Sequence, residues 1–285
     1  MISYGLVFGV VTMLLFGVSG FLIKKPISKF GNAYSSFIIL LTGEIPLALA
    51  VPFFIQQFNV YIIVMGAISS VPMALGYIFF YASLQKKQAS NTFSINVLQA
   101  VIIAVGGVAL LGETLKPIEI VGFIAGVIGV FFVTTHNRIN FDRSYLPAVV
   151  GNVLWAIYWV FLGFSVSHYG GLIPTLFIGR TISVFFTLPL YFSNRNKIHT
   201  INHKNNENLG ILLLIGGVLA GIGNIAFSLL ILFNFLAAGS IFNALSLVII
   251  ILLSFAFLKE RFTLIQTIGI ITAVIGGLLM SFFHL

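Results

Sequence analysis

The feature that most constrains this chain is a succession of long apolar stretches separated by brief polar interruptions. Hydrophobic residues make up 59% of the 285 residues and charged residues only 7%, too few to cover a water-facing surface. A helix needs roughly 20 mostly apolar residues to cross a bilayer. The pattern therefore predicts a polytopic integral membrane protein whose main solvent is lipid.

The apolar stretches predict an all-α membrane fold with ten transmembrane helices. A lipid-exposed backbone must satisfy its own hydrogen bonds, and the alternating segments of a membrane β-barrel are not seen. The helices are expected near residues 4–23, 33–55, 60–84, 91–111, 118–135, 145–166, 172–192, 209–232, 237–258 and 263–283.

Lysine and arginine are distributed unevenly over the loops between these helices. The odd-numbered loops contain twelve of them, the even-numbered loops contain only Lys116, and Arg180 lies inside an apolar stretch. Positive flanks are retained in the cytoplasm. The sequence therefore predicts a multi-pass protein of the plasma membrane, with cytoplasmic odd-numbered loops and both termini outside. The twelve residues are Lys24, Lys25, Lys29, Lys86, Lys87, Arg138, Arg143, Arg195, Lys197, Lys204, Lys259 and Arg261.

Composition and motifs argue against several functional classes. The chain has no cysteine, which excludes disulfides, thiol nucleophiles, iron–sulfur clusters and thiolate zinc sites. Its net charge of +8 sits in short gaps between apolar stretches, unlike the basic face of a nucleic-acid-binding protein. No phosphate-binding glycine loop, nucleophile elbow or paired-carboxylate motif is present. We therefore expect no enzyme, no catalytic residue, no metal or other cofactor and no nucleic-acid partner.

An internal repeat divides the chain. Its two copies are expected at residues 1–136 and 145–285, joined by a loop at 137–144, within one transmembrane unit. At an offset of 147 residues the matching pairs include Glu113 and Glu260, Gly122 and Gly269, Gly129 and Gly276, Gly76 and Gly223, and Asn96 and Asn243. At smaller offsets Leu15-Phe16-Gly17 matches Leu154-Trp155-Ala156, and Gly43-Glu44 matches Gly179-Arg180.

Each copy contains five predicted transmembrane helices. Because five is odd, the second copy must enter the membrane in the opposite sense, which makes the two copies inverted repeats. Inverted repeats are a recurrent architecture of secondary transporters, whose substrate site lies at the interface of the repeats near the bilayer midplane.

Ten helices in two halves, each with a glutamate after its fourth helix and a glycine-marked fifth helix, resemble the EamA-like family of the drug/metabolite transporter superfamily. The motifs are Gly112-Glu113-Thr114-Leu115 with Gly122, Gly126 and Gly129, and Lys259-Glu260-Arg261-Phe262 with Gly269 and Gly276. The resemblance implies a central cavity lined by the first four helices of each repeat, with the fifth and tenth helices peripheral. Family members often have a proline where this chain has Ala100 and Leu247, and an arginine that matches Arg180 but not Glu44.

Glu44 and Arg180 are the charged residues that lie deep within predicted helices, at equivalent places in the two repeats. Each must face protein or water, because burying a charge in lipid is costly. One interpretation is a mutual ion pair that holds the halves together. In the other, Arg180 binds a substrate carboxylate or phosphate, while Glu44 binds a cationic group or carries a coupling proton. An amino acid would satisfy both residues.

Uncharged polar residues form a second set of substrate-binding candidates. Asn96 and Gln99 share one helical face, as do Asn243 and Ser246 in the second repeat. Tyr77, Tyr81 and Asn224 extend this set with weaker claims. Interhelical polar packing is the alternative for all of them.

Other residues are expected to have structural roles. Trp155 and Trp159 share one helical face and are expected to be anchors at the membrane interface, with a stacking platform as the alternative. Glycines in the fifth and tenth helices are expected to pack tightly within a monomer, with homodimerisation through these helices as the alternative. Glu113 and Glu260 are expected to stabilise the start of the helix that follows each of them.

Taken together, the sequence predicts a secondary transporter that works by alternating access with proton coupling or exchange. Its expected substrate is a small polar or amphipathic metabolite, for which an amino-acid-like compound is one candidate. Its expected partners are the small-molecule substrate and membrane lipid. A flippase of a lipid-linked substrate and a non-transporting assembly protein are the alternatives; the second predicts that side chains fill the centre of the bundle.

Overall fold

The computed structural model describes residues 4–86, 92, 95–134, 143–199, 207–233, 236–258 and 263–282. No β-strand occurs in these ranges. Glu260 and the basic residues Lys87, Arg138, Lys204, Lys259 and Arg261 lie outside them.

The described residues form ten α-helices and two short 3-10 helices, η1 (Val51–Gln57) and η2 (Arg143–Tyr145). The α-helices are α1 (Tyr4–Phe30), α2 (Asn32–Ala50), α3 (Val60–Lys86), α5 (Asn96–Leu111), α6 (Pro117–Thr134), α7 (Leu146–Tyr169), α8 (Leu172–His199), α9 (Glu207–Phe233), α10 (Leu236–Leu258) and α11 (Leu264–Phe282).

The largest departures from the expected helix bounds occur where an apolar stretch meets polar residues. α1 continues past Ile23 to Phe30, and α8 continues to His199, into a segment that hydropathy assigns to a polar loop. Hydropathy shows where a helix leaves the hydrocarbon, whereas the lysines and arginine of these segments are good helix formers, so the helix can continue beyond that point.

The protein is a multi-pass membrane protein. Seven helices are long and apolar enough to cross a bilayer, and α5, α6 and α11 are shorter apolar helices. Large apolar side chains cover the outside of the bundle, among them Phe257 on α10, Leu264 on α11 and Phe185 on α8. Such a surface is suited to lipid contact and not to water.

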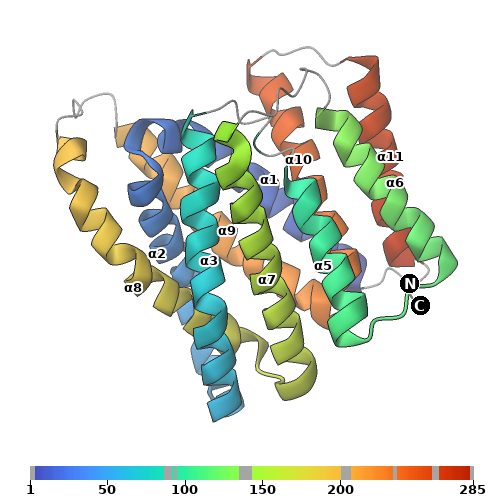
Figure 1. Ribbon diagram of the computed structural model, residues 1–285, viewed down its shortest axis with the longest axis horizontal. Helices are drawn as coiled ribbons and strands as arrows, with labels where there is room; N and C mark the ends of the chain where they lie inside the picture. Colours follow the sequence, from blue (N-terminus) through green and yellow to red (C-terminus); the bar gives the residue numbers. More distant parts are fainter. Residues whose placement is uncertain are drawn as a thin grey trace.

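Helices from the two halves of the chain interleave (Figure 1). α1 packs against α9 and α10, and the corresponding helix of the second half, α7, packs against α3 and α5. In the same way α2 packs against α9 and α8 against α3, while α2 contacts α8 and α5 contacts α10. The halves therefore form one packed unit whose contacts follow an approximate two-fold pattern.

α6 and α11 lie side by side at one edge of the molecule (Figure 1). Their small faces meet directly: a Cβ atom on Gly276 would collide with the backbone of Gly126, and one on Gly129 would collide with Ala273. The glycines thus allow close helix approach within a single chain.

Glu113 links the two halves, but not as the sequence analysis expected. Its Oε1 accepts a hydrogen bond from Leu236 N at 2.6 Å and its Oε2 one from Ala237 N at 3.2 Å, at the start of α10. The next helix, α6, is capped instead by Glu119, whose Oε2 accepts from Lys116 N at 2.6 Å. The prediction named the wrong helix, because local spacing cannot show which helix start a tertiary fold brings to a carboxylate.

We expect Glu113→Ala to reduce stability, because it removes the acceptors for two backbone N–H groups at the start of α10. Loss of a helix cap costs about 1–2 kcal/mol. The measurement is the melting temperature of the purified protein at a fixed scan rate. Glu113→Gln, which keeps one carbonyl acceptor, is the matched control, and equal melting of the alanine variant and the parent would contradict the capping role.

Candidate functional site

A central cavity of about 680 Å³, including its open mouth, lies between the two halves. Six helices line it, three from each half: α1, α3 and α5, and α7, α9 and α10. The lining residues are Phe16, Ser19, Gly20, Ile23, Met73, Tyr77, Phe80, Tyr81, Asn96, Gln99, Trp155, Tyr158, Trp159, Ala220, Asn224, Asn243 and Ser246. None of these side chains is acidic or basic.

The residues expected to bind substrate divide into two groups. Asn96, Gln99, Asn243, Ser246, Tyr77, Tyr81 and Asn224 all line the cavity. Glu44 and Arg180 do not, because α2 and α8 pack behind the lining helices. This also corrects the expectation that the first four helices of each repeat line the cavity: the second helix of each repeat supplies no lining residue.

The lining follows the internal repeat. At an offset of 139 residues Phe16 on α1 corresponds to Trp155 on α7, and at 147 residues Asn96 on α5 corresponds to Asn243 on α10. These four are the lining residues with intermediate exposure; the other thirteen are buried. Two aromatic residues and two asparagines, one of each from each half, are thus the least buried residues of the lining.

Each of the two exposed rings packs on a glycine and a phenylalanine. A Cβ atom on Gly76 would collide with the Trp155 indole, and one on Gly223 would lie 2.6 Å from the Phe16 ring. The ring centroids of Phe80 and Trp155 are 4.8 Å apart, and those of Phe227 and Phe16 are 6.4 Å apart. Gly76 and Gly223 are themselves repeat partners, so both rings are held in the same way.

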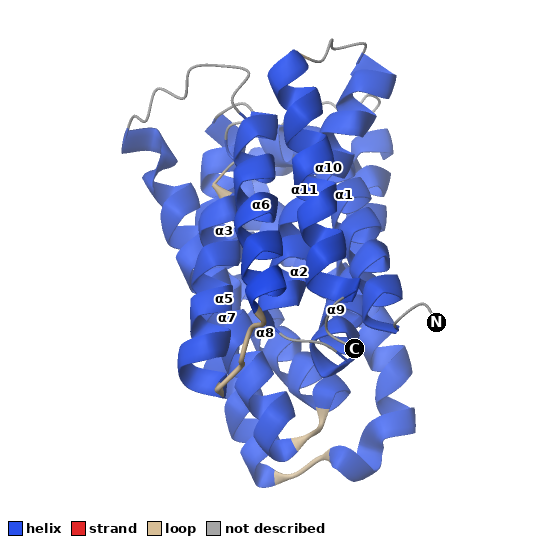
Figure 2. Cartoon of the chain, turned by 90° about the vertical axis from the view of Figure 1, so that its right-hand side faces the viewer, coloured by secondary structure: helices blue, strands red, loops and turns tan. Residues whose placement is uncertain are grey.

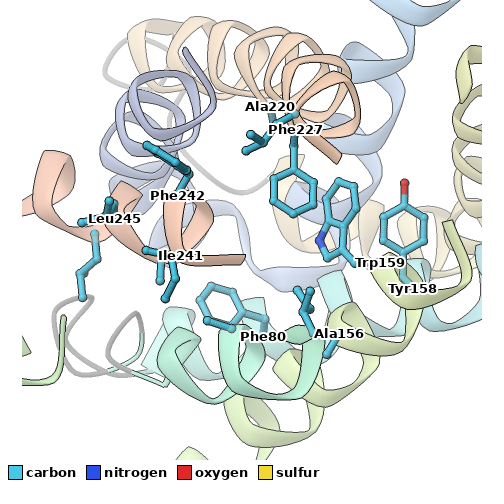
Figure 3. Packing of buried hydrophobic residues seen from close by; sticks show 14 of the residues in the cluster. Phe80, Ala156, Tyr158, Trp159, Ala220, Phe227, Ile241, Phe242 and Leu245 are labelled. Atoms are coloured by element: carbon cyan, nitrogen blue, oxygen red, sulfur yellow. The ribbon is translucent and has the colours of Figure 1, made fainter. Parts of the chain in front are cut away.

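The aromatic residues are concentrated on one side of the cavity. The α7 wall has Trp155, Tyr158 and Trp159. The corresponding positions of the first repeat, on α1, hold Phe16, Ser19 and Gly20. Figure 3 shows the Trp159 ring beside Phe227, with a centroid separation of 4.2 Å. The interfacial-anchor interpretation of Trp155 and Trp159 is wrong, because both lie in the interior.

Two polar atoms in the lining have no hydrogen-bond partner, the Asn96 Oδ1 and the Tyr158 hydroxyl. The Ser19 hydroxyl, by contrast, donates to the Gly216 carbonyl oxygen at 2.7 Å. The sequence analysis missed Phe16, Ser19 and Tyr158 as lining residues. The repeat carries the signal that would have found Phe16, because Phe16 is the repeat partner of Trp155, whereas Tyr158 lies three residues after Trp155 and so on the same face of α7.

Arg180 is fully buried between α2, α8 and the cavity wall. Its Nε donates to Leu40 O at 3.1 Å and its Nη2 donates to Ile39 O at 2.8 Å, both on α2. Its guanidinium carbon lies 6.0 Å from the centre of the Tyr77 ring, which faces the cavity. The positive charge thus sits behind the aromatic wall.

Glu44 and Arg180 are brought together as an ion pair, with 3.9 Å between Arg180 Nε and Glu44 Oε2. Thr181 Oγ1 donates to Glu44 Oε1 at 2.7 Å, and the Glu44 side chain is 14% exposed. The separation is too long for a hydrogen bond, so the carbonyl contacts of Arg180 supply its directional bonds and Glu44 supplies charge compensation. A Cβ on Gly43 would collide with the guanidinium, so this glycine makes room for it.

No group of three or more His, Asp or Glu side chains that could hold a metal ion occurs in the part of the chain that the structure describes. The amides, hydroxyls and aromatic rings of the cavity lining are suited to reversible binding through hydrogen bonds and ring contacts.

Arg180→Met should destabilise the protein, because it leaves Glu44 charged without its partner and α2 without two donors. Breaking a buried pair by removing one member costs about 3–5 kcal/mol. The double variant Glu44→Gln with Arg180→Met should recover part of this loss, as measured by thermal unfolding in detergent. A double variant that melts below the Arg180→Met single variant would contradict charge compensation.

Comparisons with known proteins agree with this architecture. The EamA-like transporter family model matches the chain twice, at residues 3–135 and 143–282. A solved structure titled only "Crystal structure of protein" has a similar fold, with a TM-score of 0.65 at 15% identity, over 100% of this chain and 98% of the other. Comparison with curated proteins gives no match. Members of the matched family are membrane transporters of small molecules, and this chain belongs to the EamA-like transporter family.

Proposed function

We propose that the protein is a secondary transporter that moves a small polar or amphipathic metabolite across the plasma membrane by alternating access. The observation that carries the proposal is the cavity lining, which the two halves build from equivalent residues. A non-transporting assembly protein would be expected to fill this space with side chains. A site at the interface of two related halves can instead open to either side as the halves rock.

The proposal includes ten membrane crossings in two inverted repeats, bounded at residues 1–136 and 145–285. Three observations support it: two successive family matches, the two-fold contact pattern, and the position of the start of α1 and the end of α11 toward the same end of the bundle (Figure 2). An even number of crossings brings both termini to one side. The basic residues of the odd-numbered loops favour a cytoplasmic location for those loops.

Glu44 is our candidate for proton coupling. It lies between the halves, 3.9 Å from Arg180 and bonded to Thr181 on α8. Protonation would remove the charge that compensates Arg180 and so weaken the contact between α2 and α8. In a buried ion pair, protonation of the acidic member removes the charge balance. Such a change can shift the equilibrium between two packing arrangements of the halves. The protein carries no ATP-binding motif, so an ion or substrate gradient would supply the energy.

Uptake into proteoliposomes tests the transport proposal. The panel should contain amino acids, nucleobases, sugars and a lipid-linked sugar, each with and without an imposed pH gradient. We expect saturable uptake of a soluble metabolite, and a decrease in that uptake for Asn96→Leu and Asn243→Leu, which remove amides of the lining while conserving volume. Movement of the lipid-linked substrate alone would favour a flippase, and no movement of any compound would contradict transport.

Glu44→Gln tests coupling. The amide keeps an acceptor for Thr181 but cannot release a proton, so uptake should lose its dependence on the pH gradient while exchange across equal pH continues. Thr181→Val, which removes the hydrogen bond but keeps the carboxylate, is the matched control. Unchanged gradient-driven uptake by Glu44→Gln would rule out a proton-carrying role.

The orientation is tested with a C-terminal reporter. If both termini are outside, a fusion that is active only in the cytoplasm should be silent, and one that is active only outside should report. The reverse pair of signals would overturn the proposed orientation.

A further inference from the structure

We propose that the cavity selects an uncharged, planar heterocycle with hydrogen-bond donors and acceptors on its edge, the chemistry of a nucleobase. The inference rests on the proposed transport function and specifies the substrate class of the same cavity. It replaces the amino-acid-like substrate that Glu44 and Arg180 suggest from the sequence alone.

The first argument concerns charge. No acidic or basic side chain lines the cavity. The Arg180 guanidinium lies behind the Tyr77 ring, where Nε and Nη2 donate to two carbonyl oxygens of α2, Nη1 is buried without a hydrogen-bond partner, and Glu44 is the counter-ion. A charged ligand would therefore lose its hydration without gaining an ion-pair partner in the lining, which is unfavourable in a low-dielectric interior.

The second argument concerns shape. The two aromatic residues of the lining that retain exposure, Phe16 and Trp155, are repeat partners that enter from α1 and α7. Each ring packs against a phenylalanine and against a glycine, so packing fixes the plane of the ring. Fixed aromatic surfaces favour a flat, conjugated ligand that can stack on them.

The third argument concerns the edge of the ligand. The two other partly exposed lining residues, Asn96 and Asn243, carry amides, and the buried Oδ1 of Asn96 lacks a hydrogen-bond partner. An amide presents a donor and an acceptor side by side, which matches the adjacent donor and acceptor on a base edge. Gln99 lies one turn from Asn96 on the same helix face and extends the amide surface.

A sugar is the competing class, since hydroxyl groups also bind amides and aromatic faces. The structure favours the heterocycle for two reasons. The two serine hydroxyls of the lining, those of Ser19 and Ser246, are buried, and Ser19 is already bonded to Gly216 O. The lining also has seven aromatic residues and only four amides. Stacking on an aromatic face stabilises a flat conjugated ring more than a puckered sugar ring.

The test is binding to the purified full-length chain in detergent, by calorimetry, with a set of closely matched probes. The neutral bases are uracil, adenine and hypoxanthine. Dihydrouracil keeps the hydrogen-bonding edge of uracil but is not aromatic, and orotate keeps the ring but adds a carboxylate. We expect at least one neutral base to bind, and expect dihydrouracil and orotate to bind at least tenfold more weakly than uracil or not at all.

Two variants locate the site. Loss of a stacking ring weakens base binding by about tenfold to hundredfold, so Trp155→Leu should show this effect, whereas Trp155→Phe should bind within a few-fold of the parent. Asn96→Leu should weaken binding without affecting the melting temperature strongly. The control is Phe185→Leu, a lipid-facing aromatic on α8 that should leave binding unchanged.

Several results would overturn the inference: no binding of any of the three bases, binding of orotate or dihydrouracil as tight as that of uracil, tight binding of glucose in their place, or equal base binding by Trp155→Leu and the parent. Failure of this inference is distinguishable from failure of the proposed function. Proteoliposomes that take up a charged amino acid or a sugar but no base would leave transport intact, whereas proteoliposomes that take up nothing would contradict both.

Discussion

In a bundle surrounded by hydrocarbon, each interior polar group depends on the protein for its partners, because lipid offers none. Arg180 shows how far this requirement shapes the structure. Its donors bind two carbonyl oxygens in the middle of α2, its charge is compensated by Glu44, and Gly43 leaves space for its guanidinium. One buried cation thereby ties α8 to α2 across the two halves and stays out of the cavity, which leaves the central lining free of fixed charge.

The cavity combines symmetry with asymmetry. Phe16 and Trp155, and Asn96 and Asn243, occupy equivalent positions, as expected of two halves that exchange roles during transport. Neighbouring positions differ: α7 has Tyr158 and Trp159 where α1 has Ser19 and Gly20. The shared positions give the two halves of the cavity a common lining. The differing positions make the α7 wall aromatic and give the α1 wall smaller side chains. These differences give the two walls of the cavity different chemistry, so a bound ligand would meet a different surface on each side.

The sequence was most informative where a pattern had one physical interpretation. Apolar length and repeat spacing anticipated the helices to within a few residues in most cases, and the polar pairs Asn96 with Gln99 and Asn243 with Ser246 were found in the lining. It failed where partners lie far apart in the chain. Glu113 caps α10 across 123 residues, and Trp155 and Trp159 line the interior, although amphipathic aromatic residues in a membrane helix are equally typical of the interface.

The sequence by itself determined the solvent, the helical class and the two-fold repetition, because hydropathy and spacing are properties of the chain in one dimension. Only the tertiary structure decided that Glu44 and Arg180 are paired with each other behind the cavity wall, and that two aromatic residues and two asparagines are the least buried residues of its lining. The reason is geometric. A helix presents its residues over its full circumference, and which side faces the cavity, a neighbouring helix or lipid is set by packing against helices from the other half.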